Sequence, residues 1–144
     1  IVLLFSLSSC STHKDLFDNS FQLSSEKDKE LIISLQRTAC FGTCPIYKIE
    51  IFSDGSSIYT GTRFVENIGV TKFSLPESQL NLILTQAETI GFTNMKEEYS
   101  EPISDLPTTF IQIKDKKIRD YTGAPKTLKN LENLIDQLYQ DAIK

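Results

Sequence analysis

Three cysteines are the side chains of this sequence best suited to chemistry, and two of them lie close together. Cys40 and Cys44 are separated by three residues in the stretch ACFGTCP, whereas Cys10 stands near the N-terminus. This spacing is compatible with a redox pair, half of a metal site, a structural disulfide, or two reduced and buried thiols. The choice depends on the compartment, because disulfides persist outside the reducing cytosol.

A metal site needs more ligands than the sequence places near the pair. Structural zinc is usually held by four Cys or His side chains, and Cys40 and Cys44 supply two. The sole histidine, His13, lies in a polar N-terminal segment. We therefore expect no metal and no other cofactor.

Thiol-disulfide exchange by the CxxxC pair is the alternative function. Redox cysteines are activated beside a helix N-terminus, often as CxxC at the start of a helix, whereas Cys40 and Cys44 stand between two segments with the pattern of strands. Gly42 relieves the backbone of a small ring, and Pro45 fixes its exit. These features favour a structural disulfide, with exchange chemistry and reduced thiols as the alternatives.

The N-terminal residues indicate export. Residues 1–7 are almost wholly apolar, and Leu7-Ser8-Ser9-Cys10 resembles a bacterial lipobox, in which the cysteine is acylated and the chain is cut before it. No initiator Met or basic region precedes the apolar run, so we expect a truncated lipoprotein signal peptide at residues 1–9. The run is too short to cross a hydrocarbon layer of roughly 30 Å.

Lipidation of Cys10 leaves Cys40 and Cys44 as an even pair of thiols. We expect a flexible tether at residues 10–29, where Ser, Asp, Asn and Lys dominate, and a single domain at residues 30–144. The acyl chains make membrane lipid the first partner and place the domain, extracytoplasmic and lipid-anchored, in the bacterial cell envelope. An envelope protein or a small ligand is the further expected partner.

Charge and composition narrow the function classes. The 144 residues include 15 basic and 19 acidic side chains, for a net charge of −4, without a cluster of Lys and Arg. Nucleic acid is therefore not an expected partner, because phosphate binding needs a basic stripe. With His13 as the only histidine, a histidine-dependent hydrolase is excluded, and no Gly-rich phosphate loop is present.

The elements that must position these residues follow from hydrophobic periodicity. Alternation with period two predicts strands at 31–36, 47–52, 57–63, 70–73, 109–114 and 118–121. Ser74 and Glu77 have the spacing of a capping box, and the helix they open ends at Gly91. Pro125 opens a second helix. The order ββββαββα predicts an α+β domain in which an antiparallel sheet packs against helices.

Other polar and aromatic residues are open to two interpretations. Arg37, Asp54, Asp105 and Asp120 could converge as an acid-base site. We favour Arg37 as an ion-pair member, although it could bind a carboxylate, and the acids as a turn, a loop and a solvent-facing strand residue respectively. The aromatic side chains Tyr47, Tyr59, Tyr99, Tyr121, Phe41 and Phe64 could form a ligand-binding face, but strands favour aromatic residues for packing, so a core role is expected.

The motif around the cysteine pair resembles a known family. Arg37, Ala39-Cys40-Phe41-Gly42, Cys44-Pro45, Tyr47, Asp54-Gly55, Tyr59, Gly61, Gly91-Phe92, Tyr99 and Asp105-Leu106-Pro107 are similar to the pattern of a domain-of-unknown-function family of bacterial lipoproteins. The resemblance covers about residues 31–139, and CFGTCP is its specific element. It implies a small extracytoplasmic domain without an assigned reaction, so no catalytic residue is expected. A noncatalytic binding or structural envelope module is the favoured function.

Overall fold

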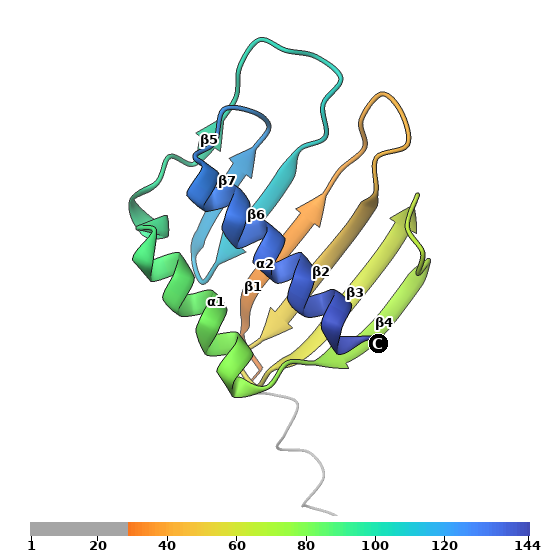
Figure 1. Ribbon diagram of the computed structural model, residues 1–144, viewed down its shortest axis with the longest axis vertical. Coiled ribbons are helices and arrows are strands. Elements are labelled where there is room, and N and C mark those ends of the chain that lie inside the picture. The colour runs from red at the N-terminus through yellow and green to blue at the C-terminus, as the bar shows by residue number, and fades with distance from the viewer. Residues whose placement is uncertain (1–28) are drawn as a thin grey trace, which may run out of the picture.

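Seven strands form one sheet, and two helices cover one of its faces (Figure 1). The computed structural model describes residues 29–144. The strands are β1 (Leu31–Arg37), β2 (Ile46–Phe52), β3 (Ser56–Arg63), β4 (Gly69–Ser74), β5 (Glu98–Tyr99), β6 (Thr109–Ile113) and β7 (Lys116–Asp120). The helices are α1 (Glu77–Thr89) and α2 (Lys126–Ala142), and a 3₁₀ turn, η2 (Phe92–Asn94), follows α1.

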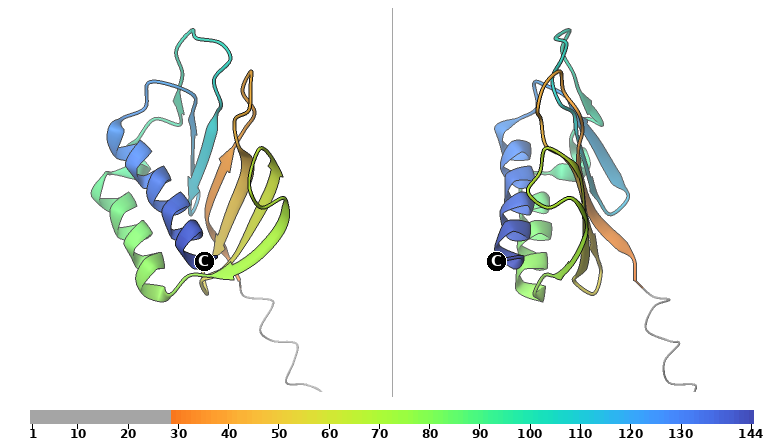
Figure 2. Two further views of the ribbon diagram at one scale, coloured as in Figure 1. Left: turned by 45° about the vertical axis from the view of Figure 1, so that its right-hand side comes forward. Right: turned by 90° about the vertical axis from the view of Figure 1, so that its right-hand side faces the viewer.

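The strand order is β4-β3-β2-β1-β6-β7-β5, which makes β1 the central strand. Neighbouring strands are antiparallel except β5 and β7, which pair in parallel. Viewed edge-on, the sheet and the helix pair form two layers, and both helices lie on the same side of the sheet (Figure 2). The other face of the sheet is not covered by a helix of the described residues.

The core lies between these layers because strand and helix periodicities both direct apolar side chains there. Leu35 of β1 is aligned with Ile49 of β2 on one side and with Ile111 of β6 on the other, and all three are fully buried. The helices add Leu80, Ile83, Ala87, Leu128, Leu131, Ile135 and Leu138. The same alternation carries Arg37, two residues after Leu35, onto the face under the helices.

The observed elements confirm the α+β class and all six predicted strands, with small differences at their ends. The order has one strand more than expected, because residues 98–99 form the short strand β5 beside β7. The capping box was wrong: Pro76 precedes the first helical residue, and no side-chain hydrogen bond caps α1. Gly91 does end the helical segment as predicted, with a left-handed φ of 67°.

The predicted signal peptide at residues 1–9 and the lipidation site Cys10 lie outside the described residues. The tether predicted at residues 10–29 lies outside them too, apart from Lys29. Within residues 29–144, no helix has both the length and the apolar character needed to cross a membrane.

Candidate functional site

A group of polar side chains lies between the sheet and α2, in an otherwise apolar layer. These seven residues, named here the interlayer cluster, are Arg37, Tyr47, Thr109, Asp120, Lys129, Glu132 and Asp136. Four come from four different strands, and three come from α2. Glu132 and Asp136 are one turn apart, so both lie on the same side of the helix.

Arg37 connects three elements at the centre of this cluster. Its guanidinium donates hydrogen bonds to Asp136 Oδ2 at 2.6 Å, to the Tyr47 hydroxyl at 2.9 Å and to Thr109 Oγ1 at 2.9 Å. The Tyr47 hydroxyl in turn donates to Asp136 Oδ1 at 2.6 Å. Arg37 is therefore an ion-pair member, as the sequence indicated, and the carboxylate that it binds belongs to its own chain.

The hydroxyl of Tyr47 stays protonated in this arrangement. Burial, and next the negative charge of Asp136, raises the pKa of Tyr47 above its ordinary value. A tyrosinate would face the carboxylate of Asp136 without a proton to share. Tyr47 therefore acts as a hydrogen-bond donor over the whole physiological pH range.

Asp120 and Glu132 face each other in the most buried part of the cluster. Each side chain is about 1% exposed, and the two carboxyl groups are near enough for the charge of Asp120 to act on Glu132. Two buried carboxyl groups this near each other repel strongly if both are charged, which favours a proton on one of them. Burial, and next the charge of Asp120, raises the pKa of Glu132 to about 8. Glu132 therefore holds the proton at neutral pH.

Two cations flank this acid pair. Lys129 Nζ lies 2.5 Å from Asp120 Oδ2, and Arg37 Nη1 lies 3.6 Å from Glu132 Oε2. Among the described residues, no aligned hydrogen-bond donor faces Asp120, so the Lys129 contact is mainly ionic. Charge attraction across the layers thus offsets part of the cost of burying two acids.

The expectation that Asp120 faces solvent was wrong. Side chains two residues apart on a strand lie on the same face, and Ile118 is fully buried beneath the helices. Asp120 follows Ile118 on that face. The short strand β7 carries Lys117 and Arg119 on its other face, and this charged composition concealed the buried position.

A pocket of about 300 Å³ opens beside Tyr47, and we name it the tyrosine pocket. Its walls come from four segments, namely the start of β2, β3, the β3–β4 connection and the C-terminal part of α2: Pro45, Tyr47, Tyr59, Phe64, Val65, Glu66, Asn67, Tyr139 and Gln140. The rings of Tyr59 and Tyr139 are stacked with centroids 4.2 Å apart, and the Tyr47 ring is 5.6 Å from that of Tyr59. The pocket is therefore backed by packed aromatic rings.

Gly61 allows the β3–β4 connection to fold over β3 at the pocket. A Cβ atom at Gly61 would lie 1.9 Å from the backbone oxygen of Asn67, 2.9 Å from Val65 Cγ2 and 3.0 Å from a ring carbon of Tyr59. Only glycine allows the connection to approach this closely. This contact brings Asn67 to the pocket, where its Nδ2 donates to the Tyr139 hydroxyl at 3.4 Å.

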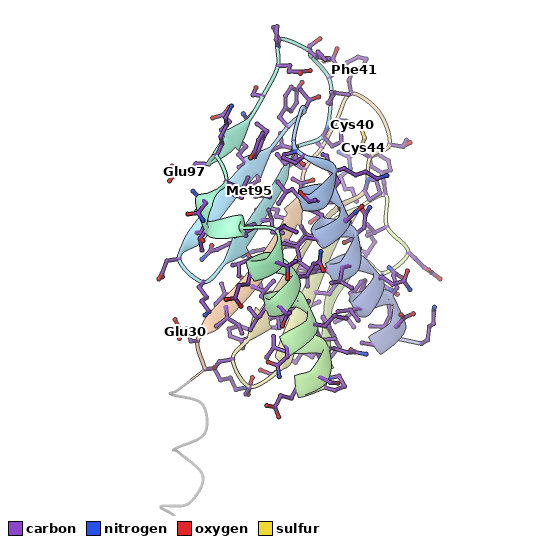
Figure 3. The ribbon with its side chains drawn as sticks, turned by 60° about the vertical axis from the view of Figure 1, so that its left-hand side comes forward. Glu30, Cys40, Phe41, Cys44, Met95 and Glu97 are labelled. Atoms are coloured by element: carbon purple, nitrogen blue, oxygen red, sulfur yellow. A yellow bond between two sulfur atoms is a disulfide. The ribbon has the colours of Figure 1, made fainter. Side chains whose placement is uncertain are left out.

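A disulfide joins Cys40 and Cys44, whose Cα atoms are 5.7 Å apart, in the connection between β1 and β2. Figure 3 shows this loop at the end of the molecule opposite Glu30, where the described chain enters the sheet. Phe41 within the loop is 88% exposed. The flanking elements are strands, so neither cysteine stands at the first turn of a helix that would lower its pKa.

Backbone hydrogen bonds fix the cysteine loop to the β5–β6 connection. The amide of Thr38 donates to the Thr108 carbonyl at 3.0 Å, and that of Phe41 donates to the Asp105 carbonyl at 3.4 Å. The loop is thus closed by a covalent bond and held at its side. Pro45, directly after the second cysteine, is a wall of the tyrosine pocket.

The structure separates the polar residues that the sequence singled out together. Arg37 and Asp120 belong to the interlayer cluster. Asp54 accepts a hydrogen bond from the Ser56 amide at 2.9 Å in the β2–β3 turn, and Asp105 lies in the exposed β5–β6 connection, as expected for a turn and a loop residue. The four residues therefore do not form one acid-base site.

The aromatic residues also divide. Tyr59 is buried, which confirms its core role. Phe41 and Phe64 are 88% and 45% exposed, so the core interpretation is wrong for both. Tyr99 is the last residue of β5, and Tyr121 directly follows β7. The Tyr121 hydroxyl donates to the Ile103 carbonyl, and neither tyrosine is part of the pocket wall.

Among the site residues that escaped the sequence analysis, four on α2 carried a signal in their helical spacing. Lys129, Glu132, Asp136 and Tyr139 lie three or four residues apart, along the apolar stripe that contains Leu128 and its helical neighbours. Acids within an apolar stripe are candidates for a buried polar cluster. Within residues 29–144, no three side chains of His, Cys, Asp or Glu converge as a metal site.

The architecture and site define a class: a two-layer α+β domain with a covalently closed loop beside a small aromatic pocket. A family model described as Domain of unknown function (DUF6438) matches residues 31–139, and the chain belongs to this family. No curated protein and no solved structure matches the chain.

Proposed function

We propose that this chain is a lipid-anchored, extracytoplasmic domain of the bacterial cell envelope that acts as a noncatalytic binding module. The observation that carries the proposal is the disulfide between Cys40 and Cys44. Such bonds persist in oxidising compartments. Export is supported independently by the apolar residues 1–7 and the lipobox-like Leu7-Ser8-Ser9-Cys10.

The internal pairing of the charged residues supports a noncatalytic role. The Arg37 guanidinium is committed to three partners of its own chain. The acid with the raised pKa, Glu132, is about 1% exposed and lies beside the buried Asp120. A general acid must reach its substrate, and this one is enclosed between the layers. The cluster therefore serves to hold α2 on the sheet.

The two ends of the domain suit a tethered module. The chain enters at Glu30, and the disulfide loop lies at the opposite end (Figure 3). An anchor at Cys10 would hold the Glu30 end toward the membrane and leave the loop end directed away from it. The partners proposed are membrane lipid through Cys10, and an envelope protein or small ligand at the domain.

The test of anchoring expresses the chain in a bacterial host, with an initiator Met and basic residues placed before Ile1. We expect the wild type in the membrane fraction, with an N-terminal peptide that begins at an acylated Cys10. Cys10→Ala should remove both the acyl mass and the membrane association. The double variant Cys40→Ala/Cys44→Ala, which keeps Cys10, is the control and should stay acylated. Acylation of Cys10→Ala or an unmodified wild type would overturn the proposed anchor.

A further inference from the structure

The tyrosine pocket is a preformed hollow of ligand-binding size. Small-molecule sites have volumes of about 300–1,000 Å³, and this pocket, at about 300 Å³, has room for a single ring-sized group. Its back wall is rigid because Tyr59 and Tyr139 stack and are almost completely buried. Ligand-induced folding is therefore not needed to form it.

Backbone strain is located at the rim of this pocket. Phe64 has a left-handed φ of 55°, which is uncommon for a residue with a bulky side chain. Such strain persists where the surrounding structure imposes it, and it clusters at binding sites. The constraint here is the close approach over Gly61, which sets the position of residues 64–67.

Charges around the pocket disfavour cationic and anionic ligands alike. Arg37 donates to the hydroxyl of Tyr47, and the Arg63 guanidinium lies 4.9 Å from the centre of the Phe64 ring. Arg63 thus already occupies a position over the Phe64 ring that would attract a ligand cation, and Arg37 adds a positive charge beside the Tyr47 hydroxyl. Glu66 lines the pocket, and Asp136 lies behind Tyr47, so an anion would meet negative charge. These charges favour a neutral molecule as the ligand of the pocket.

The polar groups of the pocket suit a ligand with several hydroxyl groups. The amides of Asn67 and Gln140 each offer a donor and an acceptor. Burial, and next the neighbouring Tyr139, raises the pKa of Tyr59 to about 12, so its hydroxyl remains protonated. Phe64 and Val65 add apolar surface. The pocket therefore offers apolar contacts next to side chains that both donate and accept hydrogen bonds. A sugar ring presents C–H faces and a rim of hydroxyls with the same mixture.

We propose that the tyrosine pocket binds one neutral sugar ring. This inference rests on the proposed function as a binding module and names the ligand class of that module. Asn67 and Gln140 bind the ring hydroxyls, and the aromatic and aliphatic walls contact its C–H groups. The site takes one ring rather than a long oligosaccharide because of its volume.

The test titrates the purified, ¹⁵N-labelled full chain with methyl glucoside and with N-acetylglucosamine, and follows backbone amide resonances. We expect saturable shifts confined to the pocket, including those of Tyr47, Gly61 and Asn67. Gln140→Ala should weaken sugar binding about fivefold, since it removes one hydrogen-bonding group. Gln137→Ala is the matched control, because Gln137 is an exposed amide of the same helix that is not part of the pocket wall. Gln140 is itself exposed, so its replacement should leave the fold intact.

Tetramethylammonium and inorganic phosphate are titrated in parallel as charged probes. Saturable binding of either at the pocket, without a response to the sugars, would overturn the ligand class and leave the binding module standing. Pocket resonances that respond to none of these probes would overturn the sugar site. Both results are independent of anchoring, which the acylation of Cys10 tests separately.

Discussion

Asp120 of β7 lies beside Glu132 of α2 between the sheet and the helix, and Glu132 holds a proton there at neutral pH. Both side chains are almost completely removed from solvent. An acid pair at this depth is stable only while one member is neutral, because two buried negative charges would repel each other. The association of the helix with the sheet is therefore linked to pH through Glu132.

Stability should fall as pH rises through the neutral range. The pKa of Glu132 is about 8 in the folded chain, against an ordinary value of 4.5, so the folded state keeps a proton that the unfolded state releases. The contribution of Glu132 to stability is complete below its ordinary pKa of 4.5 and is lost as the pH rises toward its folded-state pKa of about 8. We expect the free energy of unfolding to decrease by up to about 1.4 kcal/mol per pH unit between these values. Urea unfolding at several pH values measures this slope.

Glu132→Gln should flatten that slope, since an amide keeps a donor toward Asp120 without a titrating charge. Above the pKa of Glu132 the variant should be the more stable protein. Glu88→Gln, an exposed change on α1, is the control and should retain the wild-type pH dependence. Parallel slopes for wild type and Glu132→Gln would show that the proton is not held there. The groups that face Glu132 and could share its titration are Arg37, Asp120, Lys129 and Asp136.

Arg37→Ala should destabilise the domain by about 2–3 kcal/mol, because Asp136 and Tyr47 lose a half-buried partner. Chemical denaturation gives this value directly. Arg119→Ala provides a matched comparison: Arg119 pairs with Glu98 on the surface, and its loss should cost less than about 1 kcal/mol. Equal effects of the two substitutions would mean that Arg37 does not hold α2 to the sheet.

The disulfide should behave as a structural bond. Replacing Cys40 and Cys44 by Ser should cost about 2 kcal/mol, as the chain-entropy model predicts for so short a loop, with the fold retained. In the folded chain the bond should resist reduced glutathione, and denaturant should make it reducible; thiol titration distinguishes the two states. Rapid reduction of the folded protein would instead favour the exchange function of the CxxxC pair.

Gly61→Ala should disrupt the tyrosine pocket without unfolding the sheet. The added methyl group meets the Asn67 carbonyl at 1.9 Å, so the β3–β4 connection must move, at a cost of about 1–3 kcal/mol. Gly69→Ala meets nothing within 4 Å and pays only for its positive φ of 94°. Amide spectra should therefore show changes at residues 64–67 for Gly61→Ala alone. Unaltered resonances there would show that the close approach is not required.

Most of the sheet could be predicted because period-two alternation is strong in β1, β2 and β3, where inward residues are apolar. β5 (Glu98–Tyr99) could not be predicted, because two residues are too few to show a periodicity. These residues form a strand only through their pairing with β7. The start of α1 was predicted near Ser74, but the expected cap does not form and the helix begins at Glu77, directly after Pro76. Local signals thus located the elements, and tertiary contacts decided their details.

The candidate site was less accessible to sequence reasoning. Arg37 and Asp120 were noticed, yet a charged residue on a strand is normally assigned to solvent, and the partners that bury them lie about 100 and 12 residues away along the chain, respectively. Glu132 and Asp136 follow helical spacing, but their charge masked their position on the apolar side. Reading Glu132 and Asp136 by their place in the helical repeat, and not by their charge, would have located both on the buried side of α2.

Under the proposed N-terminal anchoring, the central position of β1 would have a mechanical consequence. Tension applied at Glu30 acts along β1, which lies between β2 and β6 with antiparallel pairing on both sides. The two ladders of backbone hydrogen bonds would have to shear together instead of opening one bond at a time from an edge. Force transmitted through the N-terminus would thus meet the most resistant strand of the sheet.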